Sequence, residues 1–172
     1  GKKTVLAAAI ILALPFMAYF VFPTFKNRLS YLRYDMTMVK NNQYVSGSND
    51  GNRMVSIQAG LMILNAHPYS GTGFGDIEHD VMKFYGSHYP QMTKQDKILP
   101  AGEWFMYGAG TGWPGIILFS LALLLPLFTT SHRGRISWWV INIAFALSYI
   151  ADIGLEVQYG VFMHGFILLW WW

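Results

Sequence analysis

The sequence contains no cysteine and little charge. Without cysteine, a disulfide framework and every thiolate zinc or iron–sulfur site are excluded. Charged residues make up 12% of the 172 residues, about half the fraction in an ordinary soluble domain, whereas hydrophobic residues make up 53%. The net charge of +3 comes from Lys and Arg scattered among acidic residues, which excludes the basic face of a nucleic-acid-binding protein. Disorder and an ordinary soluble domain are both poor interpretations of this composition.

The apolar residues are concentrated in runs without charge. These runs cover residues 4–25, 104–131, 136–151 and 157–172. The first two runs exceed the roughly 20 residues that a helix needs to cross the hydrocarbon core of a bilayer. The sequence therefore predicts an all-α fold of the polytopic α-helical membrane class, with one large, partly helical extracytoplasmic loop.

Positive charge predicts how the chain crosses the membrane. Lys2, Lys3, Arg133 and Arg135 all fall on the cytoplasmic side under one topology, as the positive-inside rule requires. We expect a transmembrane helix in 1–25, an extracytoplasmic loop in 26–103, a transmembrane helix in 104–131, a cytoplasmic loop in 132–135, and one or two further transmembrane segments in 136–172. A secretory signal is the alternative for the first apolar run. Because the chain starts without Met, we expect it to be a piece of a longer protein.

One stretch of the polar loop has the spacing of an amphipathic helix. Four apolar residues recur there at intervals of three or four and would form one stripe: Met54, Ile57, Leu61 and Leu64. Asn49, Asp50 or Asn52 can cap the start of this helix, and Pro68 ends it.

The glycine-rich segment that follows has two interpretations. Gly71, Gly73 and Gly75 alternate with other residues, and such a loop can bring backbone N–H groups close to a phosphate. The spacing matches neither a Rossmann loop nor a P-loop, which favours a tight turn.

Arginines before and at the start of the predicted loop helix suggest an anion site. Arg53 lies at the start of the helix, and a guanidinium can hold a phosphate or diphosphate in a bidentate fork. Arg28 and Arg33, with Tyr31 and Tyr34, add cationic and aromatic groups just after the first predicted span. This set is consistent with an anionic lipid headgroup or a sugar diphosphate. Anchoring at the membrane interface is the alternative, and we favour it for Arg28.

A cluster of histidines and acids after the glycines does not predict a metal site. His79 and His88 accompany Asp76, Glu78 and Asp80, but no spacing matches a known ligand pattern. A solvated acidic turn is the better interpretation.

The order of these motifs resembles the extracytoplasmic loop of the O-antigen ligase and polymerase family. Members carry an Arg on a loop helix, an (Asn/His)-Pro-x-x-Gly-x-Gly turn, a later Tyr and a His-Asn pair before the next span. Arg53, the turn at 67–73, Tyr85 and the segment 99–115 occupy these positions here. The resemblance covers about residues 29–119.

The resemblance implies a multi-pass glycosyltransferase of the bacterial inner (cytoplasmic) membrane, with residues 26–103 in the periplasm. Such an enzyme takes a glycan from an undecaprenyl diphosphate-linked donor. A ligase transfers the glycan to a lipid A core sugar and a polymerase transfers it to another lipid-linked repeat, without a cofactor or metal. The implied partners are this donor, the lipid A core or lipid-linked glycan acceptor, membrane lipids and the remaining half of the same protein.

The resemblance also implies roles for individual residues. Arg53 would bind the diphosphate, and Arg28 or Arg33 would supply a second cation. Tyr85 is a further substrate-binding position. Gly71 and Gly73 complete the substrate-binding set.

One departure from the family pattern changes the expected chemistry. Where the family has His-Asn, this chain has Ala101-Gly102, so the expected general base is missing. Glu103 is our candidate catalytic group beside Arg53, with His67, His79 and His88 as alternatives. A second class of function also fits this departure: a non-catalytic membrane scaffold or glycan-binding subunit of an envelope assembly.

Overall fold

The computed structural model describes residues 17, 19–44, 46–129, 136–151, 161–162 and 165–166. Every regular element within these ranges is a helix, so the predicted all-α class is confirmed. The helices are α2 (Pro23–Lys40), α3 (Asn49–Ala66), α4 (Ile77–His88), α5 (Glu103–Thr129) and α6 (Ile136–Ala151). Most of the first predicted span, the predicted cytoplasmic loop and most of the chain after 151 lie outside the described residues.

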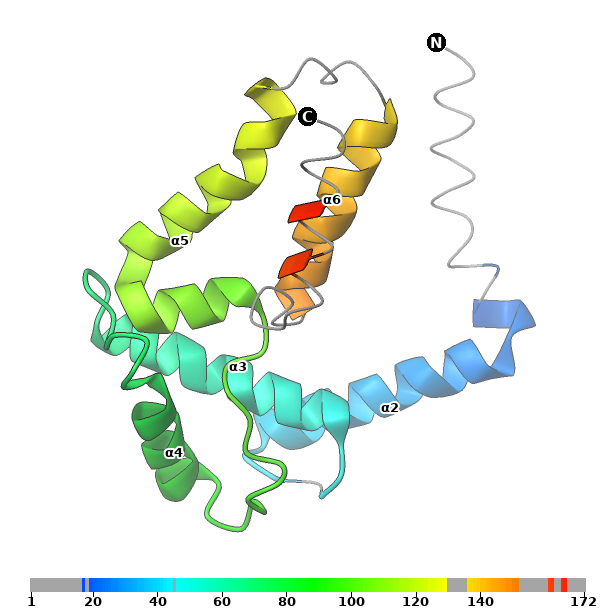
Figure 1. Cartoon of the computed structure of the whole chain (residues 1–172). Coiled ribbons are helices and arrows are strands. Elements are labelled where there is room, and N and C mark those ends of the chain that lie inside the picture. Colours follow the sequence, from blue (N-terminus) through cyan, green and yellow to red (C-terminus); the bar gives the residue numbers. More distant parts are fainter. Residues whose placement is uncertain are drawn as a thin grey trace.

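Helix α3 is the centre of the arrangement. It contacts α2, α4 and α5, and α6 contacts α5. Helices α2, α3 and α4 lie together at one end, and the second part of α5 extends away from them beside α6 (Figure 1). The polar residues of the predicted loop therefore form a helical base for the two most apolar helices.

The predicted loop helix is α3, and it ends where the sequence predicts. Its first residue follows Ser48, whose Oγ accepts a hydrogen bond from the Gly51 N–H at 3.0 Å. The cap is therefore Ser48, and not Asn49, Asp50 or Asn52. A serine in extended conformation before a helix is a favoured N-cap, because its oxygen pairs with one of the four N–H groups that the first turn leaves open.

The buried face of α3 differs from the predicted stripe. Of the four predicted apolar positions only Leu64 is buried, whereas the small residues Ala59 and Gly60 are buried as well. A Cβ on Gly60 would lie 2.9 Å from the Cβ of Pro100. Because the segment before α5 lies so close to α3, only small side chains fit at this contact. A pattern of large apolar residues cannot reveal such positions.

The main hydrophobic core lies between α3, α4 and the first part of α5. Its buried members include Val55, Ala59, Ile63, Ile77, Val81, Phe84, Met106 and Ala109. The α4 members recur at helical spacing and give that helix one apolar face. Each large side chain buried here contributes about 1.5–3 kcal/mol relative to exposure. This core attaches the polar base to α5.

Helix α5 is two helices joined at Gly112. The backbone there has φ 71° and ψ −162°, a conformation that is open essentially to glycine alone. Pro114 follows two residues later and has no N–H to donate. The first part of α5 runs along α3, and the chain then turns sharply into the second part (Figure 1).

The second part of α5 carries the apolar surface expected of a membrane helix. Within the described residues, Glu103–Leu125 is long and apolar enough to cross a membrane, and α6 contains a shorter apolar stretch, Trp138–Ile150. Exposed large side chains gather beyond the break: Ile117, Leu118, Leu121, Leu124, Leu125 and Phe128. Such an apolar surface is typical of contact with lipid. It supports membrane association, while the multi-pass topology stays a prediction.

Candidate functional site

The turn of α3 that carries Arg53 contacts the segment that carries Ala101. The Ser56 hydroxyl donates to the Arg53 carbonyl at 2.8 Å and accepts from the Ala101 N–H at 3.0 Å. Ser56 is fully buried, whereas the Arg53 side chain is exposed. Two positions far apart in the sequence therefore meet at the junction of the polar base and α5.

Gly102 fits this junction against the end of α6. Its φ is +97°, and a Cβ at this position would lie 2.4 Å from the carbonyl oxygen of Ile150. A larger residue would have to displace the α6 backbone. A glycine at this position is thus matched to a close contact with α6.

Glu103 is fully buried in the first turn of α5. An acidic residue in that turn is favoured by the positive end of the helix dipole. A general base must come within hydrogen-bond reach of the proton that it takes. The burial of Glu103 argues against the predicted catalytic role.

Tyr85 is fully buried in the core. Its hydroxyl donates to the Ile98 carbonyl at 2.9 Å, and its ring centroid lies 5.9 Å from that of Phe84. Burial raises the pKa of Tyr85 to about 12, against the smaller opposing effect of the Ile98 hydrogen bond. The side chain joins α4 to the segment before α5, which is a structural role, and the substrate-binding role stays a prediction.

The glycine-rich loop is docked on α5. The Gly71 N–H donates to the His67 carbonyl, and the N–H groups of Thr72 and Gly73 donate to the carbonyls of Ala109 and Gly110, each at 2.9 Å. The break at 112 leaves these last carbonyls of the first α5 helix without helical partners. The loop supplies the missing donors.

Packing between this loop and α5 leaves no space for a side chain at Gly71. A Cβ there would lie 2.2 Å from the carbonyl carbon of Gly110, and φ is +64°. Since the N–H groups of Gly71, Thr72 and Gly73 already donate to carbonyls, they cannot also hold a phosphate. These bonds favour the tight-turn interpretation and argue against phosphate binding by the N–H groups of Gly71 and Gly73, whose substrate-binding role stays a prediction.

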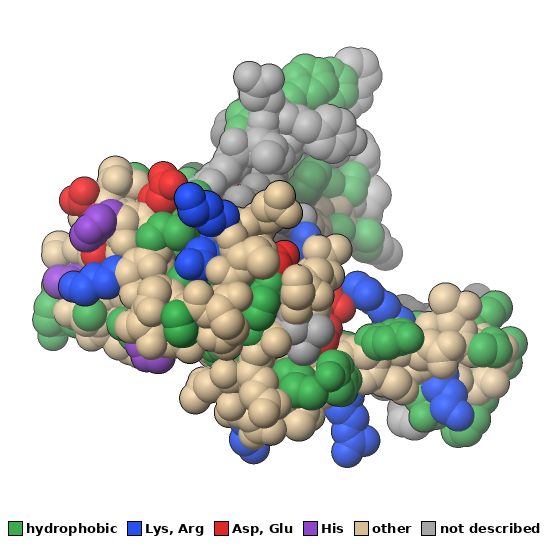
Figure 2. All heavy atoms as spheres, turned by 90° about the horizontal axis from the view of Figure 1, so that it is seen from below, with side chains coloured by type: hydrophobic (Ala, Val, Ile, Leu, Met, Phe, Trp, Pro, Cys, Tyr) green, Lys and Arg blue, Asp and Glu red, His purple; other side chains and the backbone are tan. Residues whose placement is uncertain are grey.

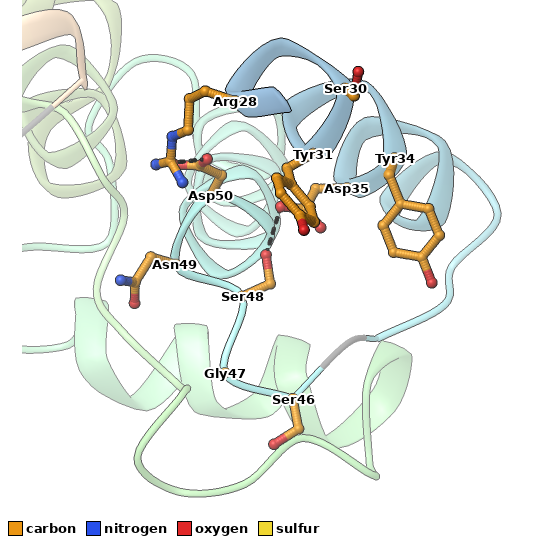
Figure 3. Close-up of a pocket in the computed structure, with 10 residues that line it drawn as sticks. All are labelled: Arg28, Ser30, Tyr31, Tyr34, Asp35, Ser46, Gly47, Ser48, Asn49 and Asp50. Atoms are coloured by element: carbon orange, nitrogen blue, oxygen red, sulfur yellow. Dashed lines mark hydrogen bonds and ion pairs between the residues drawn. The ribbon is translucent and has the colours of Figure 1, made fainter. Parts of the chain in front are cut away.

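Arg28 lies on α2 opposite the start of α3 and lines an open cavity (Figure 3). Its Nη2 lies 3.0 Å and 3.2 Å from the two carboxylate oxygens of Asp50. This pairing neutralises the cation, which argues against Arg28 as the second cation for a diphosphate. Arg33 is exposed on α2 and does not line the cavity.

Helix α2 presents apolar and basic side chains together. It extends from the rest of the molecule with hydrophobic and basic side chains side by side on its surface (Figure 2). Phe22, Phe25 and Leu29 are exposed, and Lys26 lies among them. Such a mixture is typical of a helix at the membrane interface, which fits the anchoring alternative given above for Arg28.

A carboxylate holds the start of α3 to the loop before α5. Asp96 accepts hydrogen bonds from the Tyr44 hydroxyl, from Thr93 Oγ1 at 2.8 Å and from Asn52 Nδ2 at 2.9 Å. These bonds, that of Tyr44 foremost, hold the pKa of Asp96 below its ordinary value. Sequence reasoning missed this cluster, because its members come from three separate segments with no shared motif.

The acidic and histidine side chains around the start of α4 do not converge on one point. His79 Nδ1 lies 3.5 Å from an Asp80 oxygen, with the histidine largely exposed. In the part of the chain that the structure describes, no three His, Cys, Asp or Glu side chains converge on a point that could hold a metal.

Comparisons of the sequence with known protein families and with curated proteins find no significant match. The resemblance to the O-antigen ligase and polymerase family therefore rests on the sequence motifs alone. Of the predicted site residues, Arg28 on α2 and Arg53 on α3 are exposed, whereas Tyr85 and Glu103 are buried.

Proposed function

We propose that this chain is part of an O-antigen ligase-like glycosyltransferase of the bacterial inner membrane, with several spans and residues 26–103 in the periplasm. Its substrates are an undecaprenyl diphosphate-linked glycan and a lipid A core or lipid-linked acceptor. One observation carries the proposal: the Ser56 hydroxyl joins the Arg53 turn to Ala101. These are the positions that match the Arg and the His-Asn of the family, and transfer chemistry requires them to be neighbours.

The proposed reaction places charge where Arg53 can stabilise it. The acceptor hydroxyl forms a bond to the anomeric carbon of the donor glycan, and the bond from that carbon to the diphosphate oxygen breaks. The hydroxyl proton passes to a base, for which His67, His79 and His88 are the candidates beside the buried Glu103. The leaving diphosphate gains negative charge. An exposed guanidinium can hold it with two parallel hydrogen bonds. The apolar face of α5 beyond Gly112 suits the lipid tail of the donor.

Turnover of a lipid-linked oligosaccharide by the full-length protein tests this proposal. We expect Arg53→Ala to lower the rate by about a hundred-fold to a thousand-fold, because one donor to developing charge is removed. Arg53→Lys keeps the charge without the fork and recovers part of the rate. Lys83→Ala on α4 is the matched control for loss of an exposed cation. Equal rates for Arg53→Ala and the unaltered protein would contradict the proposed role.

A non-catalytic glycan-binding or scaffold subunit is the second candidate. Ala101 in place of the family's His and the burial of Glu103 both favour it. The substitution Ala101→His separates the two, with folding checked by thermal unfolding. It is made without a change at Gly102, where a side chain would meet the Ile150 carbonyl. Turnover only in Ala101→His indicates a disabled enzyme, and turnover in the unaltered chain excludes the scaffold.

A further inference from the structure

A cavity lies between α2 and the turn before α3. It has a volume of about 590 Å³ and opens to the surface. Small-molecule sites have volumes of about 300–1,000 Å³. Arg28 and Asp50 lie at one end of the group and Tyr34 at the other, with Tyr31, Asp35 and Ser48 between them (Figure 3). Two helices and a capping turn thus build one lined recess.

The charges of this cavity disfavour an anion. Two carboxylates, Asp35 and Asp50, line it against one guanidinium, and the Arg28 guanidinium is already 3.0 Å from Asp50. A phosphate here would face a net negative lining and would have to displace a carboxylate from its partner. The lining therefore disfavours a phosphate, a diphosphate or any other anionic ligand.

The side chains of the cavity suit a sugar. Tyr31 is 66% exposed and Tyr34 is 49% exposed, so two aromatic rings are available at the opening. The C–H face of a sugar ring packs on such rings. Sugar hydroxyls can donate to the Asp35 and Asp50 carboxylates. Besides its pairing with Asp50, the Arg28 guanidinium has N–H donors to offer to a sugar oxygen.

The Asp35 carboxylate is already oriented for this purpose. It is largely buried, with 9% exposure, and its Oδ2 accepts a hydrogen bond from Ser48 Oγ at 2.7 Å. Ser48 in turn accepts from the Gly51 N–H, which fixes the serine at the start of α3. A carboxylate fixed by such bonds offers its remaining acceptor positions at a constant place, as a binding site requires.

We propose that the cavity between α2 and residues 46–50 binds neutral sugar units of a glycan chain. The source of this glycan, the donor or the acceptor of the transfer reaction, rests on the proposed function. Binding itself does not require turnover. Arg53 on α3 does not line the cavity, so the two activities can be lost separately.

Calorimetric titration of the full chain in lipid nanodiscs tests this inference. The probes are a panel of neutral oligosaccharides of gluco, galacto, manno and rhamno configuration, with inorganic pyrophosphate as the anion. We expect at least one neutral oligosaccharide to bind. The double variant Tyr31→Ala with Tyr34→Ala weakens that binding by about tenfold or more, because both stacking rings are lost. Replacing both with Phe retains most of it.

Two controls separate the outcomes. Tyr69→Ala removes a tyrosine that is 86% exposed outside the cavity, and we expect it to leave binding unchanged. We expect Arg53→Ala to lower turnover and to leave this binding unchanged. Turnover without tyrosine-dependent binding would refute the sugar site alone. The inference is also overturned if no neutral oligosaccharide shows binding that depends on Tyr31 and Tyr34, or if pyrophosphate binds in an Arg28-dependent manner.

Discussion

Two turns rich in small residues flank α3, and they differ in what their polar groups contact. The turn before the helix, residues 46–48, lines an open cavity and uses the Ser48 side chain as a cap. In the turn after it, residues 67–75, the N–H groups of Thr72 and Gly73 donate to α5 carbonyls. Glycine content predicts a turn in both places. Whether the turn can meet a ligand depends on a segment distant in the sequence.

The largest predicted effect is a difference in stability loss between alanine substitutions in the two turns, and it arises from steric space. Gly71 and Gly47 both have positive φ, but a Cβ on Gly71 would meet the α5 backbone and a Cβ on Gly47 would meet nothing within 4 Å. We expect Gly71→Ala to destabilise the protein by about 3 kcal/mol or more, from backbone strain and overpacking together. Gly47→Ala introduces backbone strain alone, and we expect it to destabilise the protein by about 1–2 kcal/mol.

Denaturant unfolding of the full chain in detergent measures this difference. Gly73→Ala serves as an internal control in the second turn, since its φ is +88° and no atom lies within 4 Å of its Cβ position. It should match Gly47→Ala. Equal losses for Gly71→Ala and Gly73→Ala would mean that the loop is not docked on α5.

A smaller predicted effect tests whether the turn before α3 depends on the Ser48 side chain. Ser48→Ala removes the cap of α3 and the donor to Asp35, and we expect a loss of about 1 kcal/mol in unfolding free energy. Ser48→Asn keeps a capping oxygen and retains stability. Ser87→Ala, at an exposed serine near the end of α4, is the control and stays within about 0.5 kcal/mol. A Ser48→Ala protein as stable as the Ser87→Ala protein would refute the cap.

The smallest effect is a difference in acid sensitivity. The carboxylate of Asp96 accepts a hydrogen bond from Asn52 at the start of α3. After α3, by contrast, the N–H groups of residues 71–73 donate to backbone carbonyls, which do not titrate. Since the pKa of Asp96 is lower in the folded protein than its ordinary 3.8, its contribution is present above that pH and is lost as the pH falls through the lowered value. Asp96→Asn should therefore lose less stability between pH 6 and pH 3 than the unaltered protein.

Glu78→Gln controls for general loss of a carboxylate, because Glu78 is exposed on α4. It should retain the acid sensitivity of the unaltered protein in the same unfolding experiment. If Asp96→Asn and Glu78→Gln show the same dependence on pH, the Asp96 cluster does not stabilise the start of α3.

The fold was predictable where the sequence carries a local signal. Helix α3 was predicted from its spacing and its stop, although its small buried residues were missed. Helix α4 had an equally clear signal in Ile77, Val81 and Phe84, which was overlooked beside the acidic cluster. Helix α2 gives no such signal, because only Asp35 and Val39 are buried in it.

The site was less predictable, because burial and pairing depend on contacts between distant segments. Tyr85 and Glu103 looked accessible by motif position and are fully buried. The pairing of Arg28 with Asp50 joins two helices, and the Ser56 link from Arg53 to Ala101 joins α3 to the segment before α5. No spacing along the chain encodes these neighbours.

The docking of residues 67–73 on the broken helix limits how this protein can be divided for experiments. A fragment ending at 103 would leave the N–H groups of Thr72 and Gly73 without their acceptors. It would also remove Met106 and Ala109 from the core that they share with Ile77 and Val81. A fragment extended through Trp113 keeps those acceptors and the Trp113 N–H bond to the Pro68 carbonyl at 2.8 Å. Antigens and crystallisation fragments of the polar region should therefore end after the break in α5.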